Sequence, residues 1–265
     1  MRKDYMNSAD SSDMDETGFV EAHWTKIWEQ EGGPQGRIDR IARQDEYSLM
    51  APYLRRMPKE ASILDGGCGM GDWVLSLVRD GFDVTGLDLS RKTVAQLQAL
   101  FPEAKFAAGD IRSTEFPDST FDAYFSWGVF EHFENGPQDC IREAVRILKP
   151  GGMLFVSVPH DNLRHAFRTT LESHKTKTEK LRFYQYRFTR SELALELAMA
   201  GLNVERVQPI HKRQGLLRSL HHGLGLPYHW IFTRGLASAL APFIPGSMIS
   251  HMILAIARKP ILAKT

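Results

Sequence analysis

A glycine-rich segment follows a short apolar run in the first third of the chain. Ile63 and Leu64 precede Asp65, and glycines then occupy positions 66, 67, 69 and 71. An apolar run that enters glycines and continues with helical apolar spacing predicts a buried strand, a tight turn and a helix. Glycines in such a turn let the backbone approach a ligand closely. By itself this pattern is a weak indication of a binding site.

Two acidic residues occur at the ends of the next two predicted strands. Asp88 follows the second strand, where a carboxylate suits the acceptance of two ribose hydroxyls. Asp110 follows the third strand, where it can accept a hydrogen bond from an adenine amino group while Ile111 packs on the ring. Ligands of parallel sheets bind at the carboxyl ends of strands, near the switch in strand order. The order of these residues therefore predicts a nucleoside site.

Further candidates for chemistry follow the fourth predicted strand. Trp127 ends that strand, where it can contact a cofactor or substrate or belong to the core. Glu131 and His132 come next, in a loop that leaves the switch point. One interpretation is general-base catalysis by this pair; the other is that both residues orient the loop through hydrogen bonds.

Alternating strands and helices must position these residues. The alternation predicts an α/β fold with a parallel sheet and helices on both faces. Strands are expected at 62–65, 82–87, 105–108, 121–126, 153–158, 202–210 and 251–258. Helices are expected at 20–30, 37–57, 73–78, 90–101, 137–148 and 189–198. Residues 1–18 are polar and acidic, so we expect a disordered tail before a single domain over 19–265. Residues 159–188 and 211–249 interrupt the alternation as lid insertions, and the early helices form an N-terminal cap.

These motifs together resemble the class I S-adenosylmethionine-dependent methyltransferases, in particular the small-molecule branch called type 11. The resemblance implies a Rossmann-like methyltransferase fold with a mostly parallel seven-stranded sheet and an antiparallel last strand. It implies S-adenosylmethionine as cofactor. The cofactor-binding residues that it implies are Asp65, Gly66, Gly67, Cys68, Gly69, Gly71, Asp88, Leu89, Asp110, Ile111, Ser126 and Trp127. Gly66 departs from the family, where a larger residue or alanine is common.

Several of these residues also have a purely structural interpretation. Asp65 could cap the following helix, or its carboxylate could face the ammonium group of the cofactor. Trp24 and Trp28 have the spacing of the buried face of an amphipathic helix, with covering of the active site as the second interpretation. His160, Tyr184 and Tyr186 are candidates for the substrate pocket; for the two tyrosines the alternative is packing of a lid against the core.

The uneven distribution of charge along the chain indicates what kinds of partner it could bind. The chain has 265 residues and a net charge of +1, but Glu205 is its last acidic residue. Eight Lys or Arg follow between Arg206 and Thr265. This basic region suggests an anionic or lipid-like small-molecule acceptor, or a solvated basic face. Residues 235–257 carry no charge, and prolines argue against a membrane span there. Peripheral membrane contact through 211–249 is the stronger expectation.

Other functional classes are disfavoured by the sequence. No Cys and His cluster has structural zinc spacing, so no metal is expected. The chain has two cysteines and no apolar leader, so a cytoplasmic location is expected. No nucleic-acid-binding module is present. A nicotinamide oxidoreductase would have a different glycine spacing. The predicted activity is methyl transfer (EC 2.1.1.-) to a small-molecule, lipid-like or glycan-intermediate acceptor. The alternative is a non-catalytic S-adenosylmethionine-binding regulatory or assembly protein.

Overall fold

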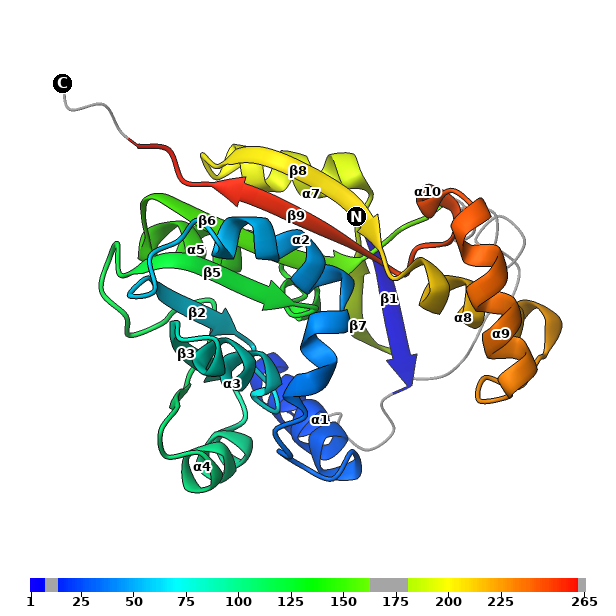
Figure 1. Ribbon diagram of the computed structural model, residues 1–265, viewed down its shortest axis with the longest axis horizontal. Coiled ribbons are helices and arrows are strands. Elements are labelled where there is room, and N and C mark those ends of the chain that lie inside the picture. The colour runs from blue at the N-terminus through cyan, green and yellow to red at the C-terminus, as the bar shows by residue number, and fades with distance from the viewer. Residues whose placement is uncertain (8–13, 163–180, 262–265) are drawn as a thin grey trace.

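The computed structural model describes residues 1–7, 14–162 and 181–261, and its centre is a seven-stranded sheet (Figure 1). The strand order is β4-β3-β2-β5-β6-β9-β8. The strands are β2 (Ser62–Gly66), β3 (Asp83–Asp88), β4 (Lys105–Ala108), β5 (Phe121–Trp127), β6 (Leu148–Pro159), β8 (Asn203–Ile210) and β9 (Met252–Arg258). The strands from β2 to β6 pair in parallel, whereas β9 runs antiparallel to both of its neighbours. The predicted mostly parallel sheet with an antiparallel last strand is confirmed.

The strand order reverses direction beside β2. The chain runs outward from β2 through β3 to β4, then returns to pair β5 with the other edge of β2. Connections above β2 and β5 therefore diverge, which opens a crevice at the carboxyl ends of these two strands. Asp65 near the end of β2 and Trp127 at the end of β5 are placed at this crevice by their position in the strands.

Helices cover both faces of the sheet, as predicted. Successive residues of a strand point to opposite faces, so Ile63 and Phe125 pack into one buried cluster and Leu64 and Tyr124 into the other. The helices of these two layers are α2 (Asp45–Leu54), α3 (Asp72–Arg79), α4 (Arg91–Leu100), α5 (Gln138–Ile147) and α7 (Arg190–Met199). Residues 37–57, expected as one helix, form the 3-10 helix η1 (Ile38–Arg43) and then α2.

The N-terminal segment differs from the expected disordered tail. Arg2–Asn7 form β1, which pairs antiparallel with β7 (Leu181–Arg187) outside the main sheet. Helix α1 (Glu16–Gln30) begins within the region expected to be disordered. Disorder over 1–18 is therefore a wrong prediction for these residues, while 8–13 lie outside the described part. The composition is polar, but Asp4 accepts a hydrogen bond of 2.6 Å from the half-buried Arg187, which fixes the strand.

The structure describes the two predicted insertions to different extents. Residues 163–180 of the first lie outside the described residues, and its last part is β7. The second is helical and consists of α8 (Lys212–Leu224), α9 (Ile231–Leu240), η3 (Ala241–Phe243) and α10 (Gly246–Ile249). These elements gather at one end of the molecule (Figure 1) around a small apolar core of their own. Among the described residues, none of the helices has the length and hydropathy of a membrane span.

Candidate active site

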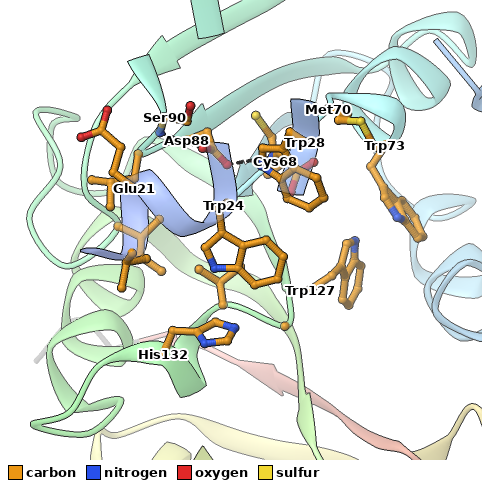
Figure 2. A pocket seen from close by; sticks show the side chains of 18 of the residues that line it. Glu21, Trp24, Trp28, Cys68, Met70, Trp73, Asp88, Ser90, Trp127 and His132 are labelled. Atoms are coloured by element: carbon orange, nitrogen blue, oxygen red, sulfur yellow. Dashed lines mark hydrogen bonds between the residues drawn. The ribbon is translucent and has the colours of Figure 1, made fainter. Parts of the chain in front are cut away.

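A cavity lies at the carboxyl ends of β2, β3, β4 and β5, where the strand order switches. The loop after β2 and the ends of β3 to β5 form its floor, and α1 covers it from the opposite side (Figure 2). The predicted cofactor-binding residues that line it are Asp65, Gly67, Cys68, Gly69, Asp88, Leu89, Asp110, Ile111 and Trp127. Residues from four separate strand ends therefore meet at one cavity.

Three predicted cofactor-binding residues support the cavity without lining it. The hydroxyl of Ser126 donates a hydrogen bond of 2.6 Å to the carbonyl of Gly66, which ties β5 to β2. The ring of Tyr124 occupies the space that a Cβ of Gly66 would need, so a side chain is excluded there. Gly71 has a φ of 75° at the start of α3, and a Cβ would meet Leu97 and Phe106.

The glycine loop is fastened to the end of β3. The amides of Gly67 and Cys68 donate to the carbonyl of Leu87 over 2.7 and 3.0 Å. The amide of Gly69 donates to Oδ2 of Asp88 over 2.8 Å. Gly67 and Gly69 have φ values of 81° and 52°, a region that L side chains rarely adopt. The loop backbone therefore forms one wall of the cavity in a fixed conformation.

Asp88 combines a structural and a binding role. Its Oδ1 accepts the amide of Ser90 over 2.9 Å, and its Oδ2 accepts that of Gly69. Each carboxylate oxygen has a second lone pair, so both can still accept a hydroxyl hydrogen from the cavity. Burial raises the pKa of Asp88, the two amides oppose this rise, and the charge of Glu21 adds to it. Glu21 belongs to α1 and also lines the cavity.

Asp65 is buried at the bottom of the cavity and makes no hydrogen bond with the described part of the chain. Burial, and to a smaller extent the charge of Asp88, holds the pKa of Asp65 well above its ordinary value. A buried carboxyl group without a partner is costly unless a cation or donor reaches it. The ammonium group and sulfonium centre of S-adenosylmethionine would supply that charge, so the residues present fit this cofactor.

Aromatic side chains cover the cavity. Trp24 and Trp28 of α1 stack with ring centroids 5.1 Å apart, and Trp127 lies 5.1 Å from Trp73. All four rings line the cavity, and Figure 2 shows them around its centre. None of the residues of α1 is buried. Trp24 and Trp28 therefore do not form the buried face of an amphipathic helix; they cover the site instead.

Polar contacts hold α1 over the cavity. The hydroxyls of Thr25 and Ser90 share a hydrogen bond of 2.6 Å. Arg112 donates to Glu16 at the start of α1 over 2.6 Å and also binds both carboxylate oxygens of Asp110. Asp110 thus lines the cavity while paired with a cation, which leaves fewer of its lone pairs for an adenine amino group.

Glu131 and His132 are both buried beside the cavity, although only His132 lines it. His132 Nδ1 donates to the carbonyl of Tyr184 over 2.9 Å, so Nε2 carries the lone pair. This Nε2 lies 3.9 Å from Oε1 of Glu131. Burial lowers the pKa of His132 to about 4 and raises the pKa of Glu131 to about 8. At neutral pH both groups are therefore uncharged.

The three predicted substrate-pocket residues lie in different surroundings. Tyr184 lines a smaller cavity next to the first, and its ring lies 5.2 Å from that of His132. Tyr186 packs in the core, and its hydroxyl donates to the carbonyl of Glu134 over 2.7 Å. His160 is buried at the end of β6, where its amide donates to the carbonyl of His251. The structure brings only Tyr184 of the three near the cofactor cavity.

Other lining residues were missed by the sequence analysis. They are Val20, Glu21, Ile41, Gln44, Met70, Asp72, Trp73, Ser90, Gly109, Gly128, Val129 and Phe133. Glu21, Trp24 and Trp28 share one helical face by their spacing, a pattern that could have indicated a polar and aromatic cover rather than a core face. Within the described residues no group of three or more His, Cys, Asp or Glu side chains could hold a metal ion.

Comparisons with known proteins agree with this geometry. Residues 64–156 match the family model described as a methyltransferase domain. A relative from Synechocystis sp., 2-methyl-6-phytyl-1,4-hydroquinone methyltransferase, is 36% identical over 54% of this chain and 47% of its own length. A ubiquinone biosynthesis O-methyltransferase of Aliivibrio fischeri is 33% identical over 38% of this chain and 45% of its own length. The chain spans about half the length of these curated relatives.

A solved structure shares the fold. It is the complex between the Haloferax volcanii Trm112 methyltransferase activator and the putative methyltransferase. The TM-score is 0.59 and the identity 24%, with 88% of this chain and 96% of that chain covered.

Proposed function

We propose that this chain, whose residues 64–156 match a methyltransferase domain, transfers a methyl group from S-adenosylmethionine to a small, lipid-like acceptor. The observation that carries this proposal is the buried, unpartnered carboxyl group of Asp65 facing a cavity whose next strand end presents Asp88. Asp65 would bind one cationic group and Asp88 two hydroxyls, and this pair of groups suits the nucleoside cofactor.

The residues of the chain would bind and orient the cofactor and the acceptor; they would not need to activate the methyl group. When bound, the cofactor supplies a methyl group on a sulfonium, which is already electrophilic. The glycine loop and Asp65 would hold the methionine end, and Asp88 with Glu21 the ribose. The aromatic rings of Trp24, Trp28 and Trp127 exclude water and present faces that favour a nearby positive charge. Alignment of an acceptor in such a site can supply roughly 7–11 kcal/mol of the barrier.

Proton removal, where the acceptor needs it, falls to His132. Its Nε2 carries a lone pair, lines the cavity and is neutral at physiological pH. Oε1 of Glu131 lies 3.9 Å from this nitrogen, too far for a hydrogen bond, and Glu131 keeps its own proton at neutral pH. A base whose pKa is about 4 accepts protons weakly, so it suits an acceptor of low pKa, such as a phenolic or enolic hydroxyl, better than an alcohol.

Aromatic and isoprenoid-like acceptors are the class we favour. The two curated relatives described above are named for hydroquinone and ubiquinone chemistry. The cavity of this chain is lined mainly by apolar and aromatic side chains, which suits a ring with an apolar substituent.

The two cysteines, Cys68 and Cys140, are buried free thiols, which supports a reducing, cytoplasmic location.

Calorimetric titration with S-adenosylhomocysteine tests the cofactor site. We expect Asp88→Ala to weaken binding by about 100-fold or more, because a charge-assisted contact to the ribose and the anchor of Gly69 are both lost. Asp83→Ala, at the other end of the same strand and in an exposed ion pair, is the matched control and should bind normally. Asp88→Asn and a thermal melt separate loss of binding from loss of the fold. Equal affinity of Asp88→Ala and the parent protein would refute the assignment.

Binding without turnover would favour the non-catalytic alternative. Radiolabelled methyl transfer to a panel of hydroquinones that carry prenyl tails distinguishes it from catalysis. Transfer to such acceptors supports the proposed class, while transfer only to compounds without an apolar tail contradicts it.

A further inference from the structure

Helices α8 to α10 lie at one end of the molecule (Figure 1). Large apolar side chains of this segment are exposed. Ile231 is 86% exposed, Phe232 61% and Phe243 84%. Leu224, Trp230, Leu240 and Met248 are exposed as well. Single exposed apolar residues are common, but so many on one short segment indicate a surface that binds something.

The exposed apolar residues form a continuous stripe along α9 and η3. Thr233, Ala237 and Ala241 are buried at intervals of four residues, which defines the inner face of this helix. Phe232, Leu236, Ala239, Leu240 and Phe243 follow at i, i+4, i+7, i+8 and i+11, which defines a second face. Only Leu236 of this second face packs against the small apolar core, and Phe232, Leu240 and Phe243 stay exposed, although the ring of Phe232 contacts that of Trp230.

Positive charge surrounds the stripe. Arg213 of α8 donates to Ser238 of α9 over 2.6 Å, and Lys212 reaches the carbonyl of Pro242. Arg234 is exposed on α9 itself. No acidic residue occurs in the sequence after Glu205. An apolar stripe with aromatic residues and basic neighbours is complementary to an anionic lipid surface.

A groove between this surface and the site shares one lining residue with the cofactor cavity. It runs between α2 and the start of α8, with Gln44 and Leu49 on one side and Lys212, Arg213 and Pro242 among the residues on the other. Gln44 also lines the cofactor cavity. A lipid-like acceptor that leaves a membrane beside η3 would therefore have a short path along this groove toward the cavity.

We propose that α9 and η3 dock on an anionic membrane surface, with Phe232 and Phe243 inserted among the acyl chains and Arg213 and Arg234 at the headgroups. This deepens the proposed function, because it identifies the source from which the acceptor is drawn. Docking does not depend on cofactor binding, so the two proposals can fail separately.

Vesicle co-sedimentation tests the proposal with the full chain. The probes are vesicles of phosphatidylcholine alone and of phosphatidylcholine mixed with phosphatidylglycerol. We expect the parent protein to bind the mixed vesicles, with binding that falls as salt rises. Phe232→Ser with Phe243→Ser should weaken binding by about tenfold or more, because two partly inserted rings are lost. Arg213→Glu with Arg234→Glu should weaken binding to the mixed vesicles specifically.

Matched controls separate docking from folding and from cofactor binding. Leu195→Ser with Met199→Ser removes two exposed apolar side chains, 58% and 76% exposed, from α7. This variant should bind vesicles like the parent protein. Every variant should bind S-adenosylhomocysteine with the parent affinity. Equal vesicle binding by the Phe232 and Phe243 variant overturns the proposal. The proposal is also overturned if the parent protein does not bind vesicles and instead forms a dimer that the Phe232 and Phe243 variant disrupts.

Discussion

At the scale of single residues, the most informative group is the buried carboxyl of Asp65, which has no hydrogen-bond partner among the described residues. Burial holds the pKa of Asp65 well above its ordinary value in the free protein. A bound cation would stabilise the charged form and lower that pKa again, so binding should release a proton. Affinity should then rise with pH through the free-protein pKa of Asp65 and level off above it.

This linkage can be measured directly. Titration with S-adenosylhomocysteine in buffers of different ionisation enthalpy reports the protons released. We expect Asp65→Asn to abolish the release and to weaken binding by about 30-fold or more, because the buried ion pair is lost. Asp72→Asn is the matched control: Asp72 also lines the cavity, but its carboxylate already accepts the amide of Arg37 over 2.8 Å. Proton release that persists in Asp65→Asn would assign it to another group.

The shifted pKa values of Glu131 and His132 predict an unusual pH profile for turnover. His132, with a pKa of about 4, stays neutral from pH 6 upward, so kcat should show no step near the ordinary histidine value of 6.5. Glu131 loses its proton near pH 8, and its charge 3.9 Å from Nε2 should make His132 a stronger base. We therefore expect kcat to rise near pH 8.

Two variants check this interpretation by steady-state kinetics. Glu131→Gln should remove the step near pH 8, and His132→Ala should lower kcat by about 100-fold at an unchanged cofactor affinity. A step near pH 6.5 that disappears in His132→Ala would instead mean that solvent reaches the ring.

At the scale of elements, α1 is a cover fixed by polar contacts. It buries no residue, yet it brings Glu21, Trp24 and Trp28 to the cavity. We expect Trp24→Ala to weaken S-adenosylhomocysteine binding by about three- to tenfold, because an aromatic contact is lost. The melting temperature should change little, because the core does not include this helix. Trp230→Ala, at the exposed residue before α9, is the control for both measurements; a large drop in the melting temperature for Trp24→Ala would show that α1 is structural.

Some elements could be predicted because local and tertiary preferences agree. Ser90 and Thr189 cap α4 and α7 through their side chains, and Thr189 forms a capping box with Glu192. Trp24 and Trp28 had two interpretations in the sequence, because helical spacing shows that two rings share a face, but not whether that face meets a core or a cavity. Ser126 and Gly66 support the cavity without lining it, since neighbours in a strand point in opposite directions.

At the scale of the whole molecule, the sheet was predictable because each strand is an apolar run bounded by turn residues. The pairing of β1 with β7 was not predictable, since it joins segments that are almost 180 positions apart. Its partners Asp4 and Arg187 look like ordinary surface charges in the sequence. Long-range pairing of polar segments leaves no local periodicity to read.

The position of β9 affects how the molecule can be made. Met252–Arg258 lie between β6 and β8, so these two strands are joined only through a segment that leaves the ribosome after both of them. Until then the edge of β6 is unpaired, and the side chains of β9 that become fully buried are missing from both layers. Nascent chains that stall before this point should therefore be prone to aggregation and should depend on chaperones.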